Sequence, residues 1–112
     1  MSIDTLPSDP KLLMRSIIQR IATGPDLSKD ISRTEAHLGT KAIIDNVIDP
    51  VQVGIYFIAL RMKRETQDEN RGVLDAVLET TRRVTAEVDE VVDIGDPYDG
   101  YNRCLPAAPF LG

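Results

Sequence analysis

Three cationic side chains, Arg61, Lys63 and Arg64, stand within four positions of one another. Such a cluster could bind a phosphate group or a nucleic-acid backbone, because lysine and arginine neutralise phosphate charge. No aromatic residue that could stack on a base is interleaved with them. They also follow a predicted helix, where positive charge complements the negative end of the helix dipole. We favour this structural interpretation over a binding site.

Cysteine and histidine, which most often hold zinc, occur only once each, as Cys104 and His37. A zinc site needs several such ligands at set spacings, so the sequence predicts no metal site. His37 lies in a predicted helix and is interpreted as a surface residue. Cys104 has no histidine or lysine near it in sequence to act as a base, and we interpret it as an incidental thiol.

Length and composition restrict the class of protein further. A chain of 112 residues predicts one domain, and no run of apolar residues is long enough to span a bilayer. Thirteen basic and eighteen acidic side chains give a net charge of −5, which disfavours nucleic acid as a partner. Residues 1–10 lack the basic and apolar regions of a signal peptide, so we expect a cytoplasmic protein without membrane contact.

The first two elements that the sequence predicts are helices, and they would help to position any site. Asp9 and Pro10 predict the start of the first helix, since aspartate caps a helix and proline suits its first position. Its apolar residues are Leu13, Met14, Ile17, Ile18 and Ile21, and Gly24 and Pro25 end it. Ser32 and Glu35 form a capping box for a second helix that runs to about Asp45. The small residues of its inward stripe, Ala36, Gly39, Thr40 and Ile43, predict a close approach by a neighbouring helix.

Two further helices follow. Asp49 and Pro50 start the third, in which nearly every side chain from Val51 to Met62 is apolar. This helix either lies at the centre of the bundle or meets a partner outside the chain. Thr66 and Glu69 form a second capping box for a fourth helix, which should reach about Thr85. Its predicted inward face comprises Asn70, Val73, Leu74, Val77 and Thr81.

The end of the chain has a different pattern. Val88, Val91, Val92 and Ile94 are β-branched and predict a strand, although no second strand is present to pair with it. The residues after it contain three prolines and no periodicity. We therefore predict an all-α fold, with a four-helix bundle domain over residues 1–87. Residues 88–112 are predicted to be an orphan strand and a proline-rich tail that begin a missing α/β domain.

Three segments in order resemble the N-terminal helical domain of glycosyltransferase family 3, best known from anthranilate phosphoribosyltransferase. They are Thr23–Ser28, Asp49–Gly54 and Ile58–Thr66. The resemblance covers roughly residues 10 to 100, and the ordered series is more specific than any one motif. Arg64 stands where the family usually has glycine.

The resemblance also implies a ligand loop after the predicted strand. Family members carry a glycine-rich loop for phosphoribosyl diphosphate there, and Gly95, Asp99, Gly100 and Asn102 match it. Pro97 removes a backbone N–H that would cradle phosphate, and Asp96 adds negative charge. We therefore expect the chain to bind neither phosphoribosyl diphosphate nor magnesium, although a complete family member would use magnesium. Asp99 is equally explained as a turn residue before glycine.

By this resemblance, the chain is the helical packing or dimerisation domain of an anthranilate phosphoribosyltransferase-like protein of tryptophan biosynthesis, not catalytic by itself. We expect a homodimer through the helical domain, with Ile55, Ile58 and Met62 at the interface, because the third helix is apolar on nearly all sides. Two alternatives stay open. The chain could form part of a phosphoribosyl- or glycosyl-transferring enzyme whose α/β domain is supplied elsewhere, or it could be a small nucleic-acid-binding relative.

Overall fold

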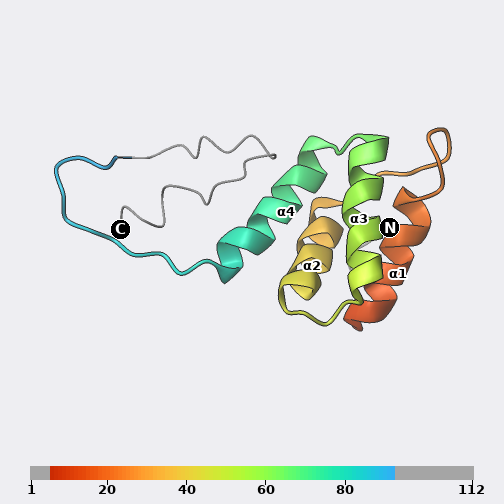
Figure 1. Ribbon diagram of the computed structural model, residues 1–112, viewed down its shortest axis with the longest axis horizontal. Coiled ribbons are helices and arrows are strands. Elements are labelled where there is room, and N and C mark those ends of the chain that lie inside the picture. Colours follow the sequence, from red (N-terminus) through yellow and green to blue (C-terminus); the bar gives the residue numbers. More distant parts are fainter. Residues whose placement is uncertain (1–5, 93–112) are drawn as a thin grey trace, which may run out of the picture. The chain divides into compact units, whose positions relative to one another are not determined.

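The computed structural model describes residues 6–92. Four α-helices form the packed part (Figure 1): α1 (Pro10–Ile21), α2 (Arg33–Ile44), α3 (Pro50–Lys63) and α4 (Gln67–Thr80). The chain divides into two units, and the division falls between Arg82 and Arg83. The predicted all-α fold with four helices is confirmed for the described residues.

Each of the four helices starts at a capping residue close to it in sequence, as predicted. The side chains of Asp9 and Asp49 accept hydrogen bonds from the backbone of Lys11 and Val51, and a proline follows each aspartate. Ser32 and Thr66 begin α2 and α4 with complete capping boxes. Each start therefore satisfies backbone donors that the helix itself leaves free.

The core lies where α1, α2 and α3 meet. Its largest side chains come from one face of α1 and from Tyr56 of α3, which is fully buried. The hydroxyl of Tyr56 lies 3.0 Å from the Thr40 hydroxyl and donates to the Ala36 carbonyl of α2. Burial raises the pKa of Tyr56, although the hydrogen bond with Thr40 opposes the shift. The phenol therefore stays neutral and joins α3 to α2.

Helix α4 lies along α2, and the two helices run in the same direction. Arg33 pairs with Asp75 and His37 with Glu79, so the partners advance together along both helices. At the crossing, a Cβ added to Gly72 would lie 2.3 Å from the Arg33 carbonyl oxygen and 2.7 Å from the Cβ of Ala36. The backbones approach this closely because both positions are small, as predicted for the inward stripe of α2.

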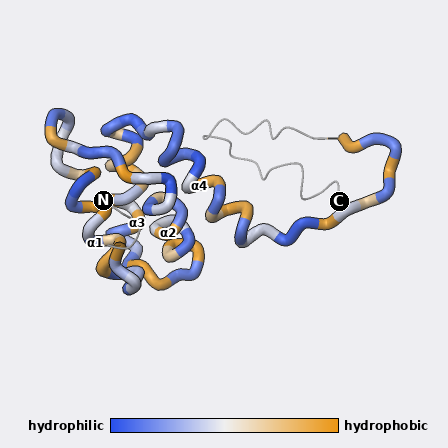
Figure 2. Tube along the Cα trace, turned by 180° about the vertical axis from the view of Figure 1, so that it is seen from behind, coloured by the Kyte–Doolittle hydropathy of each residue, from blue (hydrophilic) through white to orange (hydrophobic). Residues whose placement is uncertain are grey.

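The predicted inward face of α4 is wrong. Its buried residues are Glu69, Gly72 and Ala76, whereas Leu74 and Val77 of the predicted face are exposed. Only small residues permit the close contact with α2, so the narrow stripe through Gly72 faces the bundle in place of the bulkier apolar stripe. Hydrophobic residues consequently lie on the outer side of α4 as well as in the packed helices (Figure 2).

Helix α4 also ends earlier than predicted, at Thr80 and not near Thr85. The hydroxyls of Thr80 and Thr81 donate to the carbonyl oxygens of Ala76 and Val77, at distances of 3.0 and 2.6 Å. The Thr81 hydroxyl thereby takes the Val77 carbonyl that the Thr81 N–H would use in a continued helix, and the Thr81 backbone is extended. The helix therefore stops about five residues short of the prediction.

Residues 83–92 contain no helix or strand. They include Val88, Val91 and Val92, which are exposed, while the rest of the predicted strand and the proline-rich tail lie outside the described residues. The strand, the tail and the domain boundary at residue 87 therefore stay predictions.

Candidate functional site

The exposed side of α3 is the most conspicuous surface of the bundle. Val51, Ile55, Ile58 and Met62 recur at helical spacing, on the side of α3 opposite Tyr56 and Leu60. Ile58 is 58% exposed and Met62 is 75% exposed. We call these four residues the α3 ridge. The three side chains predicted for an interface, Ile55, Ile58 and Met62, thus lie together on one face, and no other described element covers them.

A groove of about 310 Å³ lies beside this ridge. Residues of α3, including Ile55 and Ile58, form one wall, and the segment that follows α1, including Gly24, Pro25 and Ser28, forms the other. Gly24 has a φ of +99°, a backbone conformation that favours glycine. Ridge and groove together form a continuous apolar surface with both convex and concave parts.

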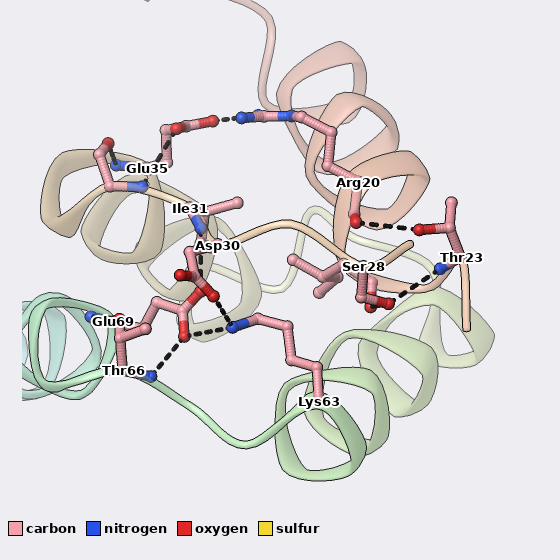
Figure 3. Close-up of polar contacts among 11 residues, drawn as sticks. Arg20, Thr23, Ser28, Asp30, Ile31, Glu35, Lys63, Thr66 and Glu69 are labelled. Atoms are coloured by element: carbon pink, nitrogen blue, oxygen red, sulfur yellow. Dashed lines mark hydrogen bonds and ion pairs between the residues drawn. The ribbon is translucent and has the colours of Figure 1, made fainter. Parts of the chain in front are cut away.

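A buried ionic cluster is centred on Lys63, which also lines the groove (Figure 3). The Lys63 ammonium donates to Asp30 Oδ1 at 2.7 Å and to Glu69 Oε2 at 2.8 Å. Glu69 is fully buried and also accepts from the backbone N–H groups of Ile31 and Thr66, at 2.9 and 2.7 Å. One carboxylate therefore joins α3, α4 and the segment before α2, and its bonds offset the cost of burying a charge.

Lys63 keeps its charge in this setting. Burial alone would lower the pKa of its ammonium, but the hydrogen bonds to Asp30 and Glu69 outweigh burial and raise it above the usual value. The sequence reasoning missed this cluster because it treated Lys63 as a solvated cation. A signal was present: Lys63 lies seven residues after Tyr56 and four after Ala59, on the buried side of the helix.

A second ion pair joins α1 to α2. Glu35 accepts a hydrogen bond from Arg20 (Figure 3) and another from the backbone N–H of Ser32. Arg20 also donates to the Ser16 carbonyl. Burial would raise the pKa of Glu35, but the bonds from Arg20 and Ser32 lower it below its usual value. The carboxylate therefore acts both as the capping group of α2 and as the partner of Arg20.

The cationic cluster of the sequence does not act as one patch. Lys63 is buried and paired, so its charge does not face solvent. Arg61 is exposed and lies 3.6 Å from Glu65, a pairing weakened by water. The interpretation of the cluster as a nucleic-acid surface is therefore reduced to two arginines, Arg61 and Arg64, without a stacking platform.

The remaining candidate residues form no further site within the part of the chain that the structure describes. His37 lies at the surface of α2 with its ring nitrogen close to Glu79 of α4. Within residues 6–92, no three potential ligands lie close enough together to hold a metal ion, and no helix is long and apolar enough to cross a membrane. The ligand-loop residues Gly95, Asp99, Gly100 and Asn102, together with Cys104, lie outside the described residues.

Four helices with capped ends, a common core and one uncovered apolar side define a helical bundle domain. Residues 15–81, more than half of the chain, match the glycosyl transferase family, helical bundle domain. The chain belongs to this family, as the three sequence motifs indicated.

Curated relatives carry a more specific name. The chain is 37% identical over 87 residues to anthranilate phosphoribosyltransferase of Bradyrhizobium diazoefficiens, which covers 78% of this chain and 25% of the relative. It is 38% identical over 84 residues to the enzyme of the same name from Anaeromyxobacter dehalogenans, covering 71% of this chain and 25% of that protein. An uncharacterized protein of Aquifex aeolicus is 28% identical over 102 residues, which are 88% of this chain and 33% of the relative.

The chain thus spans about a quarter to a third of the length of these relatives. No solved structure gives a significant match. The chain is the helical domain of an anthranilate phosphoribosyltransferase-like protein of this glycosyltransferase family.

Proposed function

We propose that this helical domain is a packing and dimerisation module that associates with a second copy of itself through the α3 ridge. The observation that carries the proposal is the exposure of Ile58 and Met62 in a row of four apolar side chains. Contiguous apolar surfaces of this kind mark contact sites in proteins, because covering them releases the free energy of removing apolar area from water.

The shape of the surface supports a symmetric partner. In a two-fold dimer the same patch meets itself, so it must contain both projecting and receiving parts. The ridge projects from α3, and the groove between α3 and Pro25 lies directly beside it. A second copy can therefore place its ridge residues against the groove while receiving those of the first.

In this proposal, the domain is not catalytic by itself and supports a transferase in the cytoplasm. The relatives are named for phosphoribosyl transfer to anthranilate, and the match to this chain covers about a quarter of two of them. Such transfer needs a clamp for diphosphate and cationic groups that stabilise the leaving group. The residues of the packed helices are instead engaged in caps, core contacts and ion pairs, so we assign the chemistry, the magnesium and any role in tryptophan biosynthesis to the rest of such a protein.

The test compares the same substitution on two apolar surfaces. Ile58→Arg places a charge on the ridge and should make the protein monomeric in light scattering and sedimentation at micromolar concentrations. Leu74→Arg places the same charge on the outer side of α4, where Leu74 is 53% exposed, and should leave association unchanged. A native chain that stays monomeric at these concentrations, or an association lost only in Leu74→Arg, would refute the proposal.

A further inference from the structure

One wall of the groove is a segment without regular secondary structure, so its position needs an explanation. Two contacts fix this segment to the end of α1. The Lys29 N–H donates to the Arg20 carbonyl oxygen at 2.8 Å, and the Ser28 hydroxyl donates to the Ile21 carbonyl oxygen at 2.8 Å. These bonds hold the segment to α1, whose Ile21 shares the core with α3, so they position the wall in part.

The width depends in addition on contacts that cross from this segment directly to α3, and Lys63 makes one. Its stem lines the groove, and its ammonium binds Asp30 at 2.7 Å (Figure 3). The Lys63 side chain is only 4% exposed, whereas the Asp30 side chain is 68% exposed. Asp30 therefore reaches back from solvent to a cation held inside the bundle.

Neutralising Glu69 does not require Asp30. The two oxygens of Glu69 already accept bonds from Lys63, Ile31 and Thr66. Loss of the Asp30 contact would leave these bonds in place, including the one from Ile31, and remove only the direct bond between Lys63 and the groove segment. The Asp30–Lys63 ion pair is therefore not needed to stabilise the buried charge of Glu69. What it affects is the position of the segment that carries Asp30.

We propose that the Asp30–Lys63 ion pair is a positioning device that holds the groove wall at the separation from α3 that a second copy requires. This role rests on the proposed self-association through the α3 ridge. Asp30 acts through Gly24, Pro25 and Ser28 and need not touch the partner itself. An ordered wall lowers the cost of binding, because fewer conformations are lost on contact.

The first experiment measures the groove wall without any dimer present. In the monomeric Ile58→Arg background, Asp30→Asn should speed hydrogen exchange of the Ser28 and Lys29 amides roughly three- to tenfold, as expected for loss of one partly exposed charged bond. Amides of Ile17 and Ala76 should be unaffected. Asp26→Asn is the matched control, because it removes the same charge from the same segment, and Asp26 makes no ion pair among the described residues.

The second experiment measures association in the otherwise native chain. Asp30→Asn should raise the dimer dissociation constant by a similar factor. The melting temperature of the helices should equal that of the Asp26→Asn variant. Equal effects of the two substitutions would show a general charge effect and overturn the positioning role. If Asp30→Asn leaves the dimer dissociation constant unchanged, the positioning role alone is refuted. If the native chain is strictly monomeric, the proposed function is refuted as well.

Discussion

At the scale of single residues, Arg64 ends α3 in a conformation that glycine adopts more readily. Its φ is +66° and its ψ is 109°, and its N–H bonds to the Arg61 carbonyl oxygen. Asn46 also has a positive φ, of 59°, but asparagine tolerates this region. After α2, the N–H groups of Asn46 and Val47 close a Schellman motif on Ile43 and Ala42.

We expect Arg64→Gly to raise the free energy of unfolding by about 1 kcal/mol, because it removes the Cβ that disfavours positive φ. The gain is limited by the larger conformational freedom of glycine in the unfolded chain. Urea unfolding followed by circular dichroism measures the change. Arg64→Ala is the control, since it removes the side-chain charge but keeps the Cβ, and it should bring no gain.

The Arg20–Glu35 pair should make stability depend on acid pH. The folded-state pKa of Glu35 lies below its usual 4.5, so its contribution is fully present above about pH 4.5 and is lost as the pH falls through the lowered value. Glu35→Gln should cost about 1–3 kcal/mol at pH 7 and flatten the loss between pH 5 and pH 3. Glu87→Gln, which removes an exposed carboxylate of residues 83–92, should keep the slope of the native protein.

At the scale of elements, the contact between α2 and α4 is a contact between backbones. Besides the Cβ of Ala36, an added Cβ on Gly72 would meet two backbone atoms of α2, the Arg33 carbonyl oxygen at 2.3 Å and the His37 nitrogen at 2.9 Å. Neither can turn aside as a side chain could. The two helices can therefore lie this close only because Gly72 has no Cβ.

Gly72→Ala should lower the free energy of unfolding by at least about 2 kcal/mol, because the added methyl group forces the two helices apart. Gly54→Ala is a matched control inside α3, where an added Cβ meets nothing within 4 Å. It should stabilise the fold by about 0.5–1 kcal/mol through helix propensity. Thermal unfolding of both variants measures the difference, and an equal response would show that the helices can adjust.

The elements differ in how far the sequence could predict them. The starts of all four helices depend on residues within three positions of one another, such as Ser32 and Glu35, and were predicted correctly. The buried side of α4 depends on a residue of another helix, Ala36, so periodicity alone selected the wrong face. The pairing of Lys63 with Asp30, 33 positions away, is a tertiary contact that local patterns do not encode.

At the scale of the whole molecule, the chain of 112 residues should bind neither phosphoribosyl diphosphate nor magnesium with a sub-millimolar dissociation constant. A diphosphate needs several backbone donors and cations in a site that excludes water. Pro97 removes one such donor, Asp96 adds a carboxylate, and the chain has a net charge of −5. Titration calorimetry with both ligands checks this expectation. Binding that disappears in Asp99→Ala would return the chain to the class of enzymes.

The buried carboxylate of Glu69 also makes the first three helices depend on the last one. Ile31 and Lys63 leave the ribosome before their common partner does, because Glu69 lies in the last helix of the bundle. Until α4 docks, the ammonium of Lys63 has only Asp30 as a partner, and the Ile31 N–H must be hydrated. A chain that ends before α4 would therefore leave both groups without Glu69, and the cost of burying them unpaired disfavours closing the first three helices over them.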